Sequence, residues 1–322
     1  MRNYYIFTSG ILKRKDNTIF IENKEGKKPI PIEDIDQIFV FGEVDFNTKF
    51  LNFIAQNKIC IHIFNYYGYY SGTFYPRETN VSGFITINQA KHYLDNEKRL
   101  KLASLFIKGA IHNIKRNLEK REGIEKEIDL IENYQKSVDK VDKISELMAI
   151  EGNVRKIYYK CFEKITNWEF ERRTIQPPKN PLNALISFGN SLVYSVVLKE
   201  IYHTPLNPSI SFLHEPSERR FSLSLDISEI FKPIISDKLI LRLINNKVIT
   251  EKHFEKSLEG IYLNEEGKKI FVKEFDEQLE NTILHRKLKK KVKYKTLIRL
   301  ELYKLIKHLL EEEEYSPLKV WW

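Results

Sequence analysis

The sequence predicts an α+β multidomain protein, with a small β domain at the N-terminus and a larger helical domain after it. The chain has 322 residues, too many for one simple core. Up to Pro76 it consists of short runs rich in β-branched and aromatic residues, which favour strands. Residues 89–147 are strongly charged, nearly lack Gly and Pro, and follow a helical pattern. We therefore expect domains at residues 1–86 and 87–322.

The strands of the first domain are expected in YYIFTSG, GILKRK and NTIFIEN, with a turn at Asp16-Asn17, and in PIPIEDIDQIFVFG. One short helix is expected at residues 46–57, because its apolar residues cluster on one side. ICIHIF is typical of a buried strand, and NYYGYYSGTFYP predicts a hairpin around Gly68 and Gly72. The domain should therefore be almost entirely β.

The second domain should contain helices joined by short loops. Residues 221–225 (FSLSL) alternate and predict an extended segment that ends at Asp226. Beyond residue 147 the helical pattern recurs in several segments. These predicted helices cover residues 147–166, 181–201, about 226–244, 250–260, 264–285 and 295–312.

The composition favours a soluble protein with a polyanionic partner. The formal net charge is +9 and the pI is about 9.1, which suits nucleic acid first and an acidic membrane surface second. The two cysteines, Cys60 and Cys161, lie in apolar contexts and are expected to be buried free thiols. No signal-peptide core is visible, and the apolar stretch 182–198 carries polar residues, so we expect a core helix, no membrane span and a cytoplasmic protein.

Glu151 is the first candidate for chemistry. It lies three residues before Val154 and four after Leu147, on or beside an apolar helix face. A carboxylate buried without a partner costs several kcal/mol, roughly, so it needs a cation. The cation could be a structural Arg or Lys, or a metal ion.

His214, Asp226 and Glu229 are the other candidates. Three-residue spacing would place the two acids on one helix face, although acids are also common in a solvated first helical turn. A lone histidine is usually a hydrogen-bonded structural residue. Combined with carboxylates, however, an imidazole suits Mg²⁺ or Mn²⁺. The sequence shows no zinc motif, P-loop, G-x-G-x-x-G or G-x-S-x-G pattern.

Basic residues cluster where a phosphate backbone could bind. Residues 286–299 contain eight Lys or Arg and no acid, with Tyr294 inside the run. The same run could be an ordinary solvated surface. The predicted DNA-binding residues are Arg172, Arg173, Arg219, Arg220, Lys289, Lys290, Lys291 and Lys293. The acidic run 311–314 is expected to be a solvated helix end.

Five segments, in order, carry a family resemblance. They are FNYYGYYSGTFYPRE, ELMAIEGNVRKIYY, PPKNPLNALISFGNSLVYSVV, SFLHEPSERRFSLSLDISEIFKP and YSPLKVWW. Together they resemble, over essentially the full length, the first CRISPR-associated (Cas) protein, the integrase of CRISPR adaptation, from a type I-B-like system. Ser211 stands where this family often has Gly, and FKP stands where it often has FRP.

The resemblance implies both a fold and an activity. It implies an N-terminal β-sandwich domain, through which a homodimer forms, and an all-α-helical catalytic domain. It implies metal ligands at Glu151, His214 and Glu229, with Asp226 supporting them or binding directly. It further implies a small second Cas protein that bridges two dimers, and the joining of the 3′-OH ends of foreign DNA into a CRISPR array by metal-dependent transesterification. A non-catalytic nucleic-acid scaffold and a stand-alone branched-DNA nuclease are the alternatives.

Overall fold

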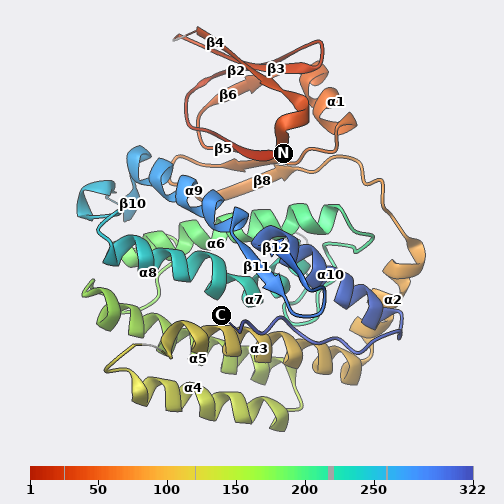
Figure 1. Ribbon diagram of the computed structural model, residues 1–322, viewed down its shortest axis with the longest axis vertical. Helices are drawn as coiled ribbons and strands as arrows, with labels where there is room; N and C mark the ends of the chain where they lie inside the picture. Colours follow the sequence, from red (N-terminus) through yellow and green to blue (C-terminus); the bar gives the residue numbers. More distant parts are fainter. Residues whose placement is uncertain (25, 120, 217–220, 259, 322) are drawn as a thin grey trace.

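The computed structural model describes residues 1–322 except 25, 120, 217–220, 259 and 322. A strand-rich N-terminal part sits at one end of a larger helical body (Figure 1). The chain passes from strands to helices between Phe74, where the last strand of the first part ends, and Gly83, where helix α2 begins. The predicted order of a β part followed by a helical part is confirmed.

The N-terminal part contains two four-stranded sheets and one helix. In the first sheet, three strands run parallel and the last is antiparallel: β1 (Arg2–Ile6), β5 (Ile35–Val40), β7 (Ile61–Phe64) and β8 (Tyr70–Phe74). The second sheet has the order β4 (Gly26–Pro31), β3 (Thr18–Asn23), β2 (Gly10–Lys15) and β6 (Val44–Phe46). Helix α1 covers Thr48–Gln56.

One apolar core joins the two sheets and α1. It includes the fully buried side chains of Leu12 and Ile19 from the second sheet, Ile38 from the first, and Phe50 from α1. The opposite face of the first sheet packs against the helical body, where the ring of Phe41 lies 5.7 Å from that of Phe188. The first sheet is therefore buried on both faces, as its continuous apolar strand ICIHIF predicts.

The helices of the second part are α2 (Gly83–Leu94), α3 (Asn96–Leu118), α4 (Glu125–Ser137), α5 (Ile144–Thr166), α6 (Pro181–Tyr202), α7 (Ser222–Lys232), α8 (Lys238–Asn245), α9 (Glu265–Glu280) and α10 (Tyr294–Leu309). Local chemistry sets several boundaries. Asp95 accepts a hydrogen bond from the N–H of Lys98 and starts α3, and Asn180 caps α6 with Pro181 in its first turn. Asn167 adopts the left-handed conformation that ends α5.

Helix α6 is the buried centre of the helical part. Among the described residues, it is the one helix long and apolar enough to cross a membrane by length and composition, and 78% of its apolar window is buried inside the protein. It packs against α7, α8 and α10. The prediction of a core helix at this stretch is confirmed. Cys60 and Cys161 are buried free thiols, also as predicted.

Two small hairpins correct the prediction of a wholly helical second domain. Residues 250–260 contain a 3₁₀ turn (Glu251–His253) and strand β9 (Phe254–Lys256), which pairs with β10 (Ile261–Leu263). The helix predicted to reach residue 285 ends at Glu280, and β11 (Thr282–His285) pairs with β12 (Lys290–Lys293). Strands of three or four residues are too short for period-2 alternation to be told from helical spacing.

The FSLSL segment was also predicted wrongly. Helix α7 begins at Ser222, so Asp226 lies inside a helix and not at the end of an extended strand. Ser222, Leu223 and Ser224 are buried and Leu225 is half-buried, because α7 packs against both α3 and α6. A helix covered on several sides needs no polar face, so its sequence loses the amphipathic signal.

Candidate active site

The predicted site residues come from elements far apart in the sequence. Helix α5 carries Glu151, helix α7 carries Asp226 and Glu229, and the segment before α7 carries His214. A π-helical turn, η3 (Pro233–Asp237), directly continues α7. Because α7 and η3 both pack on α3 and α6, their polar side chains are held inside the helical body beside α5.

Asp226 ties the His214 segment to α7. Its fully buried carboxylate accepts hydrogen bonds from the backbone N–H groups of Phe212 (2.7 Å), Leu213 (2.9 Å) and His214 (2.9 Å). It also pairs with Nδ1 of His214 at 2.8 Å. Each of its two oxygens therefore already has two partners. The contact fixes the imidazole and leaves Nε2 as the ring nitrogen available to a ligand.

Ser211 supports the same segment. Its hydroxyl lies 2.6 Å from the carbonyl oxygen of His214 and 2.8 Å from the hydroxyl of Ser222, the first residue of α7. The side chain is completely buried. A serine at this position, where the resemblance would lead one to expect Gly, thus adds a second connection between the His214 segment and α7.

Arg155 connects the acidic residues and was not predicted as part of the site. Its Nε lies 3.1 Å from Oε1 of Glu151, one helical turn earlier on α5. Its Nη2 donates to Oε2 of Glu229 at 2.5 Å and to the backbone oxygen of Glu229 at 3.2 Å. Its Nη1 lies 3.5 Å from Oδ2 of Asp237. Lys232, also not predicted, donates to Oε1 of Glu229 at 2.5 Å.

Pro233 explains why Arg155 can reach the α7 backbone. Proline has no N–H, so the carbonyl of Glu229, four residues earlier, lacks its helical partner. Arg155 supplies that missing donor. In the same turn, the side chain of Asn117 donates to the carbonyl of Pro233 at 2.5 Å. Pro233 therefore leaves the carbonyl of Glu229 without a helical N–H partner, and a side chain of the site, Arg155, takes that place.

Burial and charge push the pKa values of the site apart. Burial, and then the negative charge of Glu229, raise the pKa of Glu151. Burial alone would raise the pKa of Glu229 as well, but Lys232 and Arg155 outweigh it and hold that pKa well below its usual range. Burial would lower the pKa of His214, and the hydrogen bond and charge of Asp226 reverse that effect, so the pKa is raised. Glu151, which pairs with Arg155 alone, thus receives less compensating positive charge than Glu229, which pairs with both Arg155 and Lys232.

Asp237 is a fully buried carboxylate whose Oδ1 has no hydrogen-bond partner among the residues that the structure describes. Burial raises the pKa of Asp237 from 3.8 to about 7. Between these values the folded protein keeps a proton that the unfolded chain releases. The free energy of unfolding should therefore fall as the pH rises through this window.

Asp237→Asn is expected to remove this pH dependence. Relative to the variant, the native protein should lose about 1 kcal/mol of unfolding free energy per pH unit between about pH 4 and pH 7. Urea unfolding at several pH values in this window measures the difference. Parallel pH profiles for the two proteins would show that Asp237 stays ionised in the folded state.

The predicted metal ligands are carboxylates and one imidazole. Within the described ranges, no group of three or more His, Cys, Asp or Glu side chains is arranged so that it could hold a metal ion. The donor types nevertheless fit: an imidazole oriented by a carboxylate, and two glutamates. The charge of Glu229 acts on both Glu151 and His214, so the three lie within electrostatic reach of one another. Glu151 is paired with Arg155, and Glu229 is paired with both Arg155 and Lys232.

Comparison with known proteins gives the family. Residues 4–277 match the family model described as CRISPR associated protein Cas1. A CRISPR-associated endonuclease Cas1 from Moorella thermoacetica is 57% identical over 322 residues, covering 100% of both chains. The chain belongs to the Cas1 family. The resemblance seen in the sequence is thereby confirmed.

Solved structures agree with this assignment. A Cas1 protein from Thermotoga maritima has a TM-score of 0.91 and 45% identity, and the match covers 99% of this chain and 100% of that one. A casposase bound to integration product has a TM-score of 0.88 at 20% identity, covering 98% of this chain and 93% of that one, which shows a shared fold.

The arginines predicted to contact DNA divide into three groups in this Cas1 chain. Arg219 and Arg220 lie outside the described residues. Arg172 is exposed. Arg173 is bound within the protein, because its guanidinium donates to the side chains of Asn183 (3.1 Å) and Ser187 (2.9 Å). We therefore leave Arg173 out of the proposed DNA-binding set.

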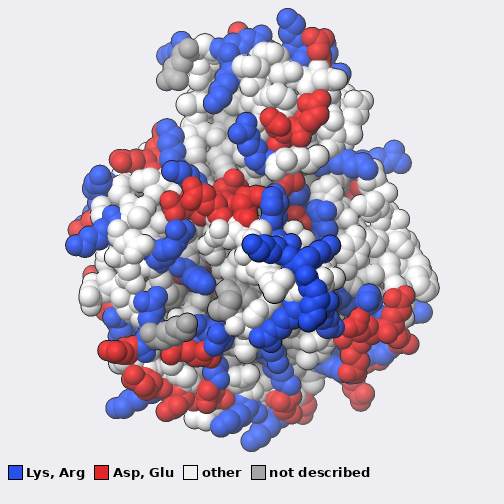
Figure 2. Space-filling view, in the orientation of Figure 1, with Lys and Arg blue, Asp and Glu red and all other residues white. Residues whose placement is uncertain are grey.

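The predicted lysines lie on the β11–β12 hairpin. Figure 2 shows a basic band across this face of the molecule, where Figure 1 places the hairpin and α10. Lys289, Lys290 and Lys291 are exposed, and Lys293 forms an ion pair with Glu280. Tyr294 is buried and cannot stack on a base from there. Arg286, in the turn between β11 and β12, has its guanidinium 4.7 Å from the ring centre of Trp321.

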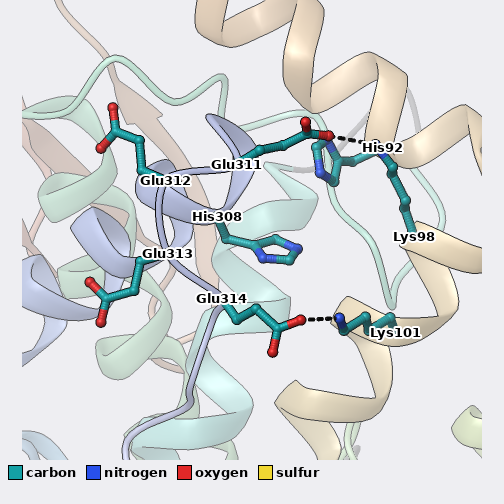
Figure 3. Close-up of a pocket in the computed structure, with 8 residues that line it drawn as sticks. All are labelled: His92, Lys98, Lys101, His308, Glu311, Glu312, Glu313 and Glu314. Atoms are coloured by element: carbon teal, nitrogen blue, oxygen red, sulfur yellow. Dashed lines mark hydrogen bonds and ion pairs between the residues drawn. The ribbon is translucent and has the colours of Figure 1, made fainter.

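A separate pocket of about 410 Å³ lies between the start of α3 and the end of α10 (Figure 3). It contains none of the predicted site residues. His92 and His308 face it, with ring centres 5.4 Å apart, and each already uses Nδ1 for a backbone contact. The acidic run 311–314 lines the pocket, is exposed, and follows the end of α10, as predicted.

Proposed function

We propose that this chain is the metal-dependent DNA endonuclease and integrase of CRISPR adaptation, which joins the 3′-OH ends of foreign DNA fragments into a CRISPR array by transesterification. The observation that supports the proposal is that Arg155 bonds to both Glu151 and Glu229, while Asp226, one helical turn before Glu229, holds His214 in place. Relatives at 50–57% identity over the full length of this chain are named CRISPR-associated endonucleases, and this chain is a DNA endonuclease of the same family.

In this proposal Glu151, His214 through Nε2, and Glu229 would hold Mg²⁺ or Mn²⁺. When bound, the ion would stabilise the negative charge that develops on the phosphate and lower the barrier to attack. Asp226 acts as a positioning residue, because both of its oxygens are occupied by the 212–214 segment. Arg155 keeps the two glutamates turned toward each other by bonding to both.

We also propose the partners of the protein, its location and the type of CRISPR system to which it belongs. DNA, as protospacer and as CRISPR repeat, is the partner of the site. A homodimer formed through the β domains and a small second Cas protein that bridges two dimers are the protein partners. We place the protein in the cytoplasm and in a type I-B-like system. Arg172 and the hairpin lysines contact phosphates and position DNA without reading bases.

The proposal is tested by measuring strand joining and strand cutting on the same DNA. Purified protein is mixed with a short duplex bearing 3′-OH ends and a plasmid with a CRISPR repeat, with Mn²⁺ or EDTA, and with or without the small Cas partner. We expect joining only with the metal. Cutting without joining under every condition would favour a stand-alone nuclease, and DNA binding without either reaction would favour a scaffold.

Neutralising the hairpin should weaken DNA binding and its dependence on salt. The triple variant Lys289→Ala, Lys290→Ala and Lys291→Ala removes three exposed charges. The slope of log affinity against log salt concentration should become shallower by about 2 to 3, because each lost phosphate contact contributes about 0.9. Fluorescence anisotropy at several salt concentrations measures it.

A matched control keeps the change in net charge constant. Lys126, Lys136 and Lys140 are exposed lysines on and after α4, away from the hairpin. Their triple alanine variant should keep the native slope. Equal slopes for both triple variants would mean that the hairpin attracts DNA only through the net charge of the protein.

A further inference from the structure

Glu229 has both of its carboxylate oxygens occupied by cations. Lys232 donates to Oε1 at 2.5 Å and Arg155 donates to Oε2 at 2.5 Å. The residue is only 4% exposed, so water does not replace these contacts. A divalent ion that uses Glu229 as a ligand must therefore share an oxygen with a cationic side chain or displace it. Sharing is unfavourable, because like charges repel strongly where little water screens them.

The two cations are held very differently. Arg155 makes contacts with Glu151, with Asp237, and with both the side chain and the backbone of Glu229. Its planar guanidinium could leave only if all of these contacts broke. Lys232 has one hydrogen-bond partner among the described residues, Glu229, and its side chain remains 14% exposed. An ammonium on a flexible four-carbon stem can move away with the loss of one contact.

The ammonium of Lys232 also acts on the other two candidate ligands, Glu151 and His214. Its charge opposes the rise in the pKa of Glu151 and the rise in the pKa of His214, so the ammonium is within electrostatic reach of both. A divalent ion held by the three candidate ligands would act on the same groups with the same sign. The ammonium also occupies Oε1 of Glu229, an oxygen that the ion would use, so the two cations compete for this carboxylate.

We infer that Lys232 is an exchangeable internal cation that holds Glu229 in the metal-free protein and leaves it when the divalent ion binds, whereas Arg155 is a fixed cation that stays. This inference rests on the proposed metal site and adds to it a residue that sets how tightly the ion is held. It predicts that removing the charge of Lys232 raises the affinity for the metal and lowers the stability of the metal-free protein.

The test measures Mn²⁺ binding without DNA, by titration calorimetry and by the electron paramagnetic resonance signal of free Mn²⁺. Lys232→Met removes the competing charge and keeps the length of the stem. We expect it to bind Mn²⁺ about tenfold more tightly, the scale on which groups around metal ligands act. In EDTA its melting temperature should fall below that of the native protein, because Glu229 loses a partner.

Lys232→Arg is expected to change Mn²⁺ affinity in the direction opposite to Lys232→Met. Its guanidinium can make two bonds to the carboxylate and resists displacement, so Mn²⁺ affinity should fall about tenfold. The matched control is Lys304→Met. Lys304 pairs at 2.6 Å with Glu301, a buried glutamate also three residues earlier on its helix, far from the site in sequence. This control should leave Mn²⁺ affinity unchanged.

The outcomes separate the inference from the function on which it rests. If the native protein binds Mn²⁺ in a way that needs Glu151 and His214, and Lys232→Met and Lys232→Arg bind with the native affinity, the exchange role of Lys232 is wrong and the metal site stands. If the native protein and all variants fail to bind Mn²⁺, both are wrong. Tighter binding by Lys232→Met together with weaker binding by Lys232→Arg supports both.

Discussion

Glu151→Gln is expected to abolish Mn²⁺-dependent joining and cutting of DNA without destabilising the metal-free protein. Glutamine keeps the size of the side chain and an oxygen that can accept from Arg155, but it removes the charge that a divalent ion needs. The rate should fall by about a thousandfold or more, because several kcal/mol of charge stabilisation in the transition state are lost.

The stability of this variant is the informative second measurement. Because burial and Glu229 raise the pKa of Glu151, the ionised carboxylate is held unfavourably in the folded protein. Its replacement should leave the melting temperature in EDTA unchanged or higher. Glu163→Gln, at a partly exposed glutamate of the same helix that pairs with Lys160, is the control and should retain full activity. Native rates for Glu151→Gln would remove Glu151 from the active site.

Asp226→Asn is expected to reduce both stability and activity severely. Oδ2 of Asp226 accepts from the N–H groups of Phe212 and Leu213, and Oδ1 lies between the N–H and the Nδ1 of His214. An asparagine must point its NH₂ group at one of these pairs of groups, whichever way the amide is turned. One buried pair then loses its acceptor and faces another donor.

The expected loss of unfolding free energy is about 3 to 5 kcal/mol, the range seen when one partner of a buried charged network is removed. Urea unfolding measures this loss, and Mn²⁺ affinity should fall with it because the imidazole of His214 is no longer fixed. Asp129→Asn, at an exposed aspartate of α4, should change neither quantity. A stable Asp226→Asn variant with native Mn²⁺ affinity would show that the 212–214 segment is held by Ser211 and backbone packing alone.

The sequence predicted the two-part architecture well because the two parts use different periodicities over long stretches. Strand-type runs reach Pro76, and helical spacing continues for most of the remaining chain. It failed where an element was short or surrounded. The β9–β10 and β11–β12 hairpins have three or four residues per strand, and α7 is buried on most sides, so neither shows a periodic polar face.

The candidate site was predictable in its residue types but not in its connections. Glu151 needed a cation because of the apolar stripe around it, and the family resemblance added His214, Asp226 and Glu229. Arg155 and Lys232 were visible as basic residues one helical turn from an acid. Nothing local distinguished them from ordinary surface pairs, because Arg155 reaches Glu229 on another helix, and the Lys232–Glu229 pair has the three-residue spacing common on helix surfaces.

The sequence by itself therefore determined the family and the order of the β and helical parts, and it supplied the acids and histidine proposed for the site, since these depend on local pattern and residue type. Only the tertiary structure decided what each of them touches. It placed Asp226 against three backbone N–H groups and Glu229 between Arg155 and Lys232. The division between a positioning acid and a proposed ligand follows from these contacts, because hydrogen bonds and charges act over a few ångströms whatever the separation in sequence.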